Sequence, residues 1–269
     1  MAGSAMYIKP DADLEKIKDK ILYYPFSGSD WFVPIKLFRG LISEFWFVDS
    51  NYSFGENETD QYNMNSFPDM TFLEESFMGE RVRKDVEILY TDKVKPYRYL
   101  EPGFFSKKYR YQNREITIVF RRGYDYTSLF GPSSLEIAEE RIGIFFLRGT
   151  SSEGGSNHPW NHSLPIKILR GHKKVSLPRK LVNTLPDGGL IATDGSLSFP
   201  VYPVKGYVNE FEPFSKFTNM VSGEEAMEKA KPFFDKEGNL FTCIGYANRR
   251  NRPTLIWQVS KQKFDNQNK

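Results

Sequence analysis

Two segments near the start of the chain constrain its fold more than any other feature. The first, 23–31, begins as a short apolar strand and continues into a turn of small and polar residues at 25–30. An amphipathic helix is predicted at 31–41, and a second apolar strand at 44–49 ends in the carboxylate of Asp49. This order is typical of a nucleotide-binding α/β unit, in which the acid accepts from a ribose hydroxyl. The turn alone is weak evidence, because it holds only Gly28 where a dinucleotide fingerprint has three glycines.

Composition narrows the class of protein. The 269 residues suffice for one large domain or two small ones, and an aromatic share of 16% argues against disorder. No apolar run reaches the roughly 18 residues of a membrane helix. The single cysteine, Cys243, excludes an internal disulfide and a cysteine-cluster metal site. Residues 1–6 lack the basic and apolar regions of a signal peptide and look like a cloning remnant before a native Met6. We therefore expect a cytoplasmic protein with no membrane segment.

Further along the chain, predicted strands alternate with predicted helices. Strands are expected at 86–90, 97–100, 105–111, 115–121, 142–147, 190–193, 240–247 and 254–261, and helices at 133–141, 177–185 and 224–234. The last two strands are expected to form an antiparallel hairpin. The predicted organisation is a tag-like or disordered start at 1–11, one α/β domain at 12–262 with a β-rich insertion at about 52–123, and a polar tail at 263–269.

Charge is unevenly distributed between two neighbouring stretches. Residues 51–92 contain ten acidic and three basic residues, whereas residues 93–122 contain nine basic and two acidic residues. One interpretation is that the two stretches are adjacent surface segments that balance each other. The other is that the basic segment 93–122 contacts an acidic or phosphate-bearing partner, with its tyrosines stacking on single-stranded bases. We favour the first interpretation, because an alternation of basic residues and tyrosines is ordinary in a half-exposed sheet.

Three segments and the order of elements resemble the class I S-adenosylmethionine-dependent methyltransferases. Residues 23–30 resemble the family's first-strand ligand loop, and residues 45–49 resemble its second strand with the ribose-binding acid. The run Leu185–Ile191 is similar to the leucine, proline, Gly-Gly and apolar run that enters the family's fifth strand. The closing hairpin is similar to the sixth and seventh strands. The resemblance implies an α/β fold with a mainly parallel seven-stranded sheet, helices on both faces and an antiparallel last strand.

The resemblance also implies a cofactor, S-adenosylmethionine. Its binding residues in this chain would be those of the turn and of the end of the second strand: Pro25, Ser27, Gly28, Ser29, Asp30 and Asp49. Ser27 and Ser29 stand where the family usually has glycine, and Asp30 would replace the family's missing acid by accepting from an amino group. Asp30 also directly precedes the predicted helix, so a helix N-cap and a ligand contact are equally expected. Asp194, which follows the strand at 190–193, is expected to start a turn.

The loop after the strand at 142–147 is predicted to hold the methyl acceptor, as the resemblance implies. His158 is the candidate catalytic base, because an imidazole titrates near neutral pH. A surface loop in which His158 packs on Trp160 is an equal alternative. The candidate acceptor-binding residues are Arg148, Asn157 and Trp160, with Arg249 and Arg250 at the tip of the final hairpin. No metal site is expected, since Pro159 breaks the helix that His158 would need to share one with His162.

The predicted function is therefore methyl transfer from S-adenosylmethionine to an unidentified acceptor, either a small molecule or a nucleic acid. The alternative is a catalytically inactive relative of the same fold, which binds nucleic acid or protein through residues 93–122. A different nucleotide- or sugar-phosphate-using enzyme on the same sheet is a third interpretation.

Overall fold

The computed structural model of the chain describes residues 6–25, 27, 30–49, 52–53, 62–63, 86–94, 104–111, 114–122, 141–148, 182–194, 212–217, 222–248 and 253–262. The chain divides into two compact units. The first unit comprises residues 17–142, and the second comprises residues 1–16 and 143–269. The single domain expected at 12–262 stays a prediction.

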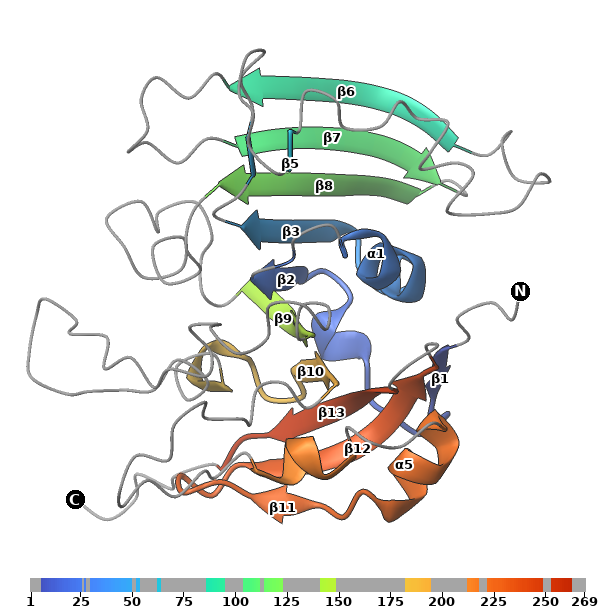
Figure 1. The fold of residues 1–269 in the computed structure, drawn as a ribbon, viewed down its shortest axis with the longest axis vertical. Coiled ribbons are helices and arrows are strands. Elements are labelled where there is room, and N and C mark those ends of the chain that lie inside the picture. The colour runs from blue at the N-terminus through green and yellow to red at the C-terminus, as the bar shows by residue number, and fades with distance from the viewer. Residues whose placement is uncertain are drawn as a thin grey trace, which may run out of the picture. The chain divides into compact units, whose positions relative to one another are not determined.

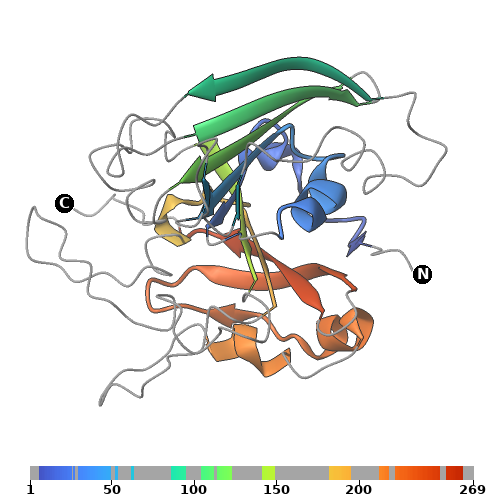
Figure 2. The same ribbon diagram turned by 45° about the horizontal axis from the view of Figure 1, so that its top comes forward.

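The sheet of the first unit combines parallel and antiparallel strands. Its strands lie in the spatial order β2, β3, β8, β7, β6 (Figure 1). In that order their bounds are Ile21–Pro25, Glu44–Asp49, Arg114–Arg122, Phe104–Tyr111 and Val86–Val94. β2, β3 and β8 are parallel, whereas β7 and β6 extend the sheet in antiparallel fashion. The β-rich segment expected at 52–123 therefore extends the sheet that contains β3, and Figure 2 shows β6, β7 and β8 as adjacent green strands.

Two further strands of the first unit form a separate pair. β4 (Tyr52–Ser53) and β5 (Tyr62–Asn63) are parallel to each other. Before the sheet begins, residues 15–17 form one 3-10 turn, η1 (Glu15–Ile17), at the boundary between the two units.

The parallel strand β3 is apolar because both of its faces are covered. Every residue of β3 after Glu44 is buried, as expected for a parallel strand inside an α/β protein. On one face, the ring of Phe47 stacks on Phe120 of β8, with a centroid distance of 5.3 Å. Trp31, which leads into the helix α1 (Phe32–Phe38), meets the edge of Phe120 at 5.8 Å. The start of α1 is therefore held against this face of the sheet.

The helix α1 ends earlier than its hydrophobic pattern predicts. We expected a helix at 31–41, but α1 ends at Phe38. The carbonyl oxygen of Phe38 accepts hydrogen bonds from the amides of both Leu41 and Ile42, at 2.8 and 2.7 Å. These bonds close a turn at residues 39–41, so that the buried side chain of Ile42 follows the turn rather than the helix.

The second unit also has a mixed sheet. Its strands lie in the order β1, β12, β13, β10, β9, with bounds Met6–Ile8, Leu240–Ala247, Thr254–Ser260, Leu190–Thr193 and Ile142–Leu147. The first residue of β9 is counted with the first unit. β9 and β10 are parallel, whereas β13 is antiparallel to both β10 and β12. The closing hairpin and the predicted bounds of the strands at 142–147, 190–193 and 240–247 are thus confirmed.

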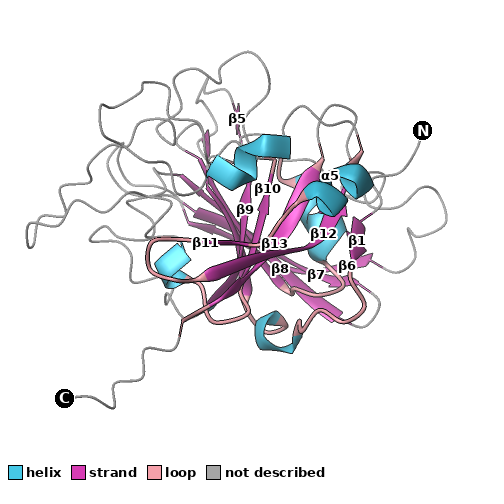
Figure 3. Ribbon diagram, turned by 90° about the horizontal axis from the view of Figure 1, so that it is seen from below, coloured by secondary structure: helices cyan, strands magenta, loops and turns pink. Residues whose placement is uncertain are grey.

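An aromatic core lies on one face of the closing hairpin. Trp257 of β13 is fully buried, and its ring meets Phe214 at 5.3 Å and Phe233 at 5.6 Å. Phe214 belongs to the 3-10 helix η6 (Glu212–Phe217) and Phe233 to the short strand β11 (Phe233–Phe234). The helix α5 (Gly223–Lys229) packs against β12 and β13 (Figure 3). Burying several large rings together supplies much of the stability of such a layer.

The helix α5 begins where the sequence predicts but ends earlier. Its N-cap is Ser222, whose hydroxyl oxygen accepts from the amide of Glu225 at 3.4 Å. We expected the helix to continue to about Phe234, and this is wrong. Pro232 disfavours a helical conformation at the residue before it, and the chain then turns into β11, which pairs with β12.

The first described residues, Met6–Ile8, form β1 and pair with β12. We had placed these residues in a tag-like or disordered start. The two strands approach each other closely at Gly245. A Cβ atom at this position would lie 2.3 Å from the carbonyl oxygen of Tyr7. β1 can therefore lie beside β12 only while position 245 lacks a side chain.

Both units thus show a mixed α/β architecture, in agreement with the predicted fold class at that level. Within the described residues, no helix is both long enough and apolar enough to span a membrane.

Candidate functional site

The ends of β2 and β3 lie at one edge of the parallel part of the first unit. Pro25, the last residue of β2, pairs in register with Val48, and Asp49 is the last residue of β3. Ligands of open α/β sheets bind outside the carboxyl ends of parallel strands. The structure therefore brings the turn at 25–30 and the acid Asp49 to the same edge.

Ser27 extends the pairing of the two strands into the turn. Its amide donates to the carbonyl oxygen of Val48 at 3.2 Å, and its hydroxyl donates to the same oxygen at 3.5 Å. The residue is only 1% exposed. The amide of Asp30 in turn donates to the carbonyl oxygen of Ser27 at 2.8 Å, which closes a tight turn over 27–30. Ser27 is therefore held against the end of β3.

Asp30 does not have the capping role that we considered for it. The N-cap position of α1 is occupied by Trp31, whose side chain makes no capping hydrogen bond. Instead, Oδ2 of Asp30 accepts a hydrogen bond from the hydroxyl of Tyr24 at 3.3 Å. Tyr24 is buried near the end of β2, so its hydroxyl holds the carboxylate of Asp30 close to the strand ends. The carboxylate is thus positioned from the sheet and not from the helix.

Asp49 is buried on the same face of the sheet as Tyr24 and Phe47. Side chains alternate between faces along a strand, and Tyr24 pairs in register with Phe47, two residues before Asp49. The ring of Tyr24 meets that of Phe47 at 6.3 Å. Asp49 is 6% exposed and stands in register with Arg122 of β8. A carboxylate is costly to bury unless other groups donate hydrogen bonds to it, so a charged residue here marks the strand end as a site of polar interactions.

The side chains at this edge are mainly hydrogen-bond acceptors. Asp30 and Asp49 offer carboxylate oxygens, and Ser27 offers a hydroxyl. The hydroxyls of a sugar and an ammonium group are donors, so the chemistry of this set suits a ligand that carries such groups. The set does not suit an unpaired phosphate, which needs donors.

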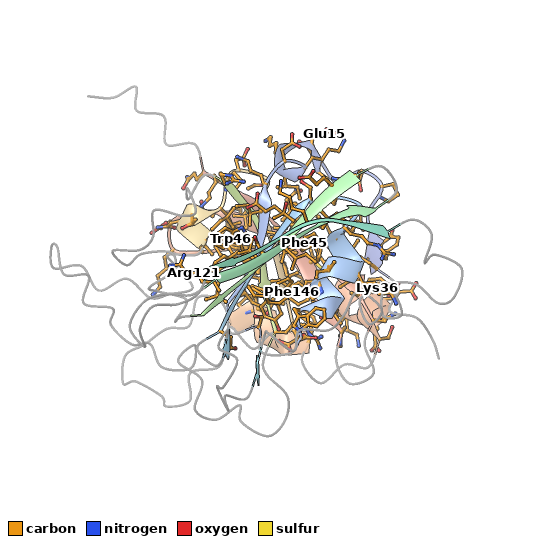
Figure 4. The ribbon with its side chains drawn as sticks, turned by 90° about the horizontal axis from the view of Figure 1, so that it is seen from above. Glu15, Lys36, Phe45, Trp46, Arg121 and Phe146 are labelled. Atoms are coloured by element: carbon orange, nitrogen blue, oxygen red, sulfur yellow. The ribbon has the colours of Figure 1, made fainter. Side chains whose placement is uncertain are left out.

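A buried arginine on the opposite face was missed as a structural residue. Arg121 is 1% exposed and stands in register with Val48, on the face that also carries Tyr23 and Trp46. Burial lowers the pKa of the Arg121 guanidinium from its usual value, while the nearby Tyr23 acts in the opposite direction. Arg121 is one of the nine basic residues counted in 93–122, but its burial removes it from the surface charge of that segment. Trp46 and Arg121 are labelled in Figure 4.

At the other end of this face, Trp46 joins a chain of polar contacts. Its indole nitrogen donates to Oε1 of Glu44 at 2.7 Å, and Nη2 of Arg141 lies 2.5 Å from Oε2 of the same residue. These contacts lie toward the amino end of β3. They explain the position of the Glu44 side chain, so no functional role is needed for it.

One lysine of the basic segment is paired with an acid of the neighbouring strand. Lys108 and Glu115 form an ion pair with a distance of 2.6 Å between Nζ and Oε1. Arg110 stands in register with Glu115 on one side and with Glu87 on the other. The Lys108–Glu115 pair agrees with the interpretation that adjacent surface strands neutralise each other, and a basic face over 93–122 stays a prediction.

In the second unit, the candidate residue Arg148 and the expected turn residue Asp194 follow the ends of parallel strands. Arg148 comes directly after β9 and is half-buried, and Asp194 comes directly after β10 and is buried. The last paired residues of these strands are Leu147 and Thr193. Arg148 and Asp194 are therefore neighbours at the carboxyl edge of β9 and β10.

The other candidates lie outside the described residues, and they remain predictions. They are Gly28 and Ser29 of the turn, the loop residues Asn157, His158 and Trp160, and the hairpin residues Arg249 and Arg250. Only the backbone of Pro25 is described. In the parts of the chain that the structure covers, no three residues of the metal-ligating types His, Cys, Asp and Glu come together.

Comparison with protein-family models, with curated proteins and with solved structures finds no match to this chain.

Proposed function

We propose that the chain binds S-adenosylmethionine at the carboxyl ends of β2 and β3 and transfers its methyl group to an acceptor. One observation carries this proposal. The in-register pairing of β2 with β3 brings Ser27, Asp30 and Asp49 to one edge of a parallel sheet. Asp49 follows Gly28 by 21 residues, close to the spacing of about 20 that separates a phosphate-binding turn from a ribose-binding acid in dinucleotide folds.

The proposal includes the finer layout of the fold, a mainly parallel seven-stranded sheet with helices on both faces. The strand order within the first unit supports it. Along the chain, β2, β3 and β8 are the first, second and third strands of the parallel set, and in space they follow one another in that order. The first half of a doubly wound sheet has the same order. In the second unit, the parallel pair β9 and β10 followed by an antiparallel hairpin is compatible with the second half.

Both carboxylates at this edge have a counterpart in the proposed ligand. Asp49 would accept from the ribose hydroxyls, and Asp30, held by Tyr24, would accept from the ammonium group. Ser27 and Asp49 are almost fully buried, so a ligand that used both would have to displace the atoms that cover them. Binding would then be coupled to a local rearrangement.

When bound, the cofactor supplies a methyl carbon that is activated by a positively charged sulfur. The chain's own task is to align the acceptor with this carbon and to keep water away, and such alignment is the main source of rate. Arg148, Asn157, Trp160, Arg249 and Arg250 would hold the acceptor. His158 would accept the proton of an acceptor that must lose one. We expect this acceptor, a small molecule or a nucleic acid, to be a cytoplasmic molecule.

Calorimetry with S-adenosylmethionine tests the proposal. Saturable heat with the full chain is expected, and Asp49→Ala and Asp49→Asn should each weaken binding by more than tenfold. Asp187→Asn is a matched control, because Asp187 is an exposed aspartate that pairs with Lys16 in the second unit. No heat at high ligand concentration would remove the methyltransferase proposal, and an unchanged affinity in both Asp49 variants would show that the site is elsewhere.

A second candidate function is a methyltransferase-like module without catalysis, which binds a protein. The burial of Ser27 and Asp49 favours it, because a lost cofactor site is expected to be filled by packing. Nucleic acid is the weaker partner for such a module, since Lys108 is already paired with Glu115. Salt-dependent binding of a single-stranded oligonucleotide would instead favour nucleic acid as the partner.

A further inference from the structure

Asp187 is followed by Gly188 in the turn that leads into β10, and this dipeptide is chemically reactive. In an Asp–Gly sequence, the backbone amide nitrogen of the glycine can attack the side-chain carbonyl carbon of the aspartate, because glycine has no Cβ atom to hinder the approach. The chain contains two such sequences, Asp187–Gly188 and Asp194–Gly195, and both residues of the first are described. The side chain of Asp187 is 45% exposed, so water reaches it.

The reaction needs no reagent other than water. When the carboxyl group of Asp187 is protonated, the Gly188 nitrogen forms a bond to Cγ and loses its proton, and the carboxyl hydroxyl leaves as water. The product is a cyclic succinimide. Addition of water at Cγ restores aspartate, whereas addition at the main-chain carbonyl gives isoaspartate, in which the backbone runs through Cβ and Cγ.

The structure restrains both reacting groups. The amide of Gly188 donates to the carbonyl oxygen of Val259 at 2.8 Å, so the attacking nitrogen is held by β13. Oδ1 of Asp187 accepts from the amide of Lys261 at 3.1 Å, and Oδ2 lies 2.8 Å from Nζ of Lys16. Attack at Cγ therefore requires the nitrogen and the carboxyl group to leave these partners first.

The charge of Lys16 adds a further restraint. The reaction consumes the protonated carboxyl group, and a neighbouring ammonium favours the ionised carboxylate. The hydrogen bond to Asp187 and the attraction of its charge raise the pKa of Lys16. Lys261, the other lysine in contact with Asp187, directs its ammonium to the carbonyl oxygen of Val182. The stem of Lys16 also lies over the turn, since a Cβ atom at Gly188 would be 3.2 Å from its Cδ atom.

We propose that Asp187 is a site of isoaspartate formation, which the folded chain keeps latent through Lys16 and the end of β13. Conversion lengthens the backbone by one carbon atom and so disrupts the turn at the start of β10. The amount of isoaspartate then records how often this turn opens. The inference is independent of the methyl-transfer proposal, because none of its residues belongs to the proposed cofactor or acceptor site.

Peptide mapping of the full chain after incubation at pH 6 tests the proposal, with fragmentation that separates isoaspartate from aspartate. Isoaspartate at position 187 should form at least tenfold faster in the chain unfolded in guanidinium chloride than in the folded wild type. Lys16→Met keeps the stem and removes the charge, and it should react about two- to fivefold faster than the wild type, as expected for the loss of an exposed ion pair. Lys16→Arg keeps the charge and should react as slowly as the wild type.

Lys231→Met is the matched control, because it removes another exposed lysine of the second unit. It should leave the rate at Asp187 unchanged. Equal rates in the folded and unfolded wild type, or equal rates in Lys16→Met and Lys231→Met, overturn the proposal. Hydrogen exchange of the Gly188 amide should be the same in Lys16→Met and the wild type. Faster exchange in this variant would contradict protection by the charge.

Discussion

The hydroxyl of Tyr24 donates a hydrogen bond to Oδ2 of Asp30, and this contact links the sheet to the turn at the candidate site. Tyr24 is fixed by its neighbours in the buried sheet, whereas Asp30 is only partly buried. The carboxylate therefore takes its position from a rigid strand, which is the arrangement that a binding site requires.

Tyr24→Phe removes this contact while keeping the ring. A hydrogen bond of this kind contributes about 1 kcal/mol, so the free energy of unfolding should fall by about that amount. The affinity for S-adenosylmethionine should fall by up to about fivefold, because Asp30 loses its orientation. Urea denaturation and calorimetry measure the two effects. Tyr23→Phe is the matched control, since Tyr23 lies on the other face of β2 and leaves Asp30 unchanged. If the two variants have equal affinities, Asp30 is not a ligand contact.

The sequence predicts best those elements whose hydrophobic pattern fits only one type of secondary structure. The bounds of β3 and β9 are correct because each is a continuous apolar run between polar residues. The predicted end of α5 is wrong. Phe233 and Phe234 fit the helical period, but Pro232 prevents the helix from reaching them. The position of the candidate site also follows from sequence, since parallel strands place their carboxyl ends at one edge.

What the sequence does not reveal is which side chains are covered. Arg121 and Arg122 are adjacent and chemically identical, and their neighbours in the chain are basic or apolar. The burial of Arg121 follows from the pairing of β8 with β3, a contact between segments about seventy residues apart. In the same way, the partner of Asp30 depends on the side chain of Tyr24 and not on the helix beside it.

Arg121→Lys should make the stability of the chain depend on pH. Burial already lowers the pKa of the guanidinium at this position, and a lysine ammonium, which is more strongly hydrated, should be affected more. The folded-state pKa of Lys would fall below its unfolded value of about 10.4. The unfolded state then binds more protons between these two values, so stability rises with pH in this window. Urea denaturation at pH 7 and pH 9.5 should show a larger gain for the variant than for the wild type, and parallel changes would contradict the burial of this charge.

Cys243 should be unreactive in the folded chain. Burial raises the pKa of its thiol to about 11, and Sγ donates to the carbonyl oxygen of Gly245 at 3.6 Å. Because the thiolate is the nucleophile, a disulfide reagent at pH 8 should label the folded chain at least tenfold more slowly than the urea-unfolded chain. Cys243 is the only cysteine, so the signal has one source. Equal labelling rates in the two states would show that the thiol is accessible.

The same thiol contributes to the pH dependence of stability. Its folded-state pKa lies above the ordinary value of 9.0, so its contribution is fully present below about pH 9 and is lost as the pH rises toward about 11. Cys243→Ala should lack this loss. The two chains are compared by urea denaturation at pH 8 and pH 10.5, and an equal decline in both would contradict the buried, protonated thiol.

Gly245→Ala should detach β1 from the sheet of the second unit. The added Cβ atom would lie 2.3 Å from the carbonyl oxygen of Tyr7 and 3.1 Å from the Cα atom of Ile8, so the backbone of β1 must move. Overpacking of this kind costs about 1–3 kcal/mol. The amide of Lys9, which donates to the carbonyl oxygen of Ile244 at 2.8 Å, should lose its protection from hydrogen exchange.

Gly40→Ala is the matched control for this prediction. A Cβ atom at position 40 meets no other atom within 4 Å, so the substitution should leave both stability and exchange almost unchanged. The two variants add the same methyl group and differ only in what it contacts. Retained protection of the Lys9 amide in Gly245→Ala would show that β1 does not depend on the close approach to β12. Loss of protection in Gly245→Ala but not in Gly40→Ala would establish that β1 (Met6–Ile8) pairs with β12 only because position 245 has no side chain.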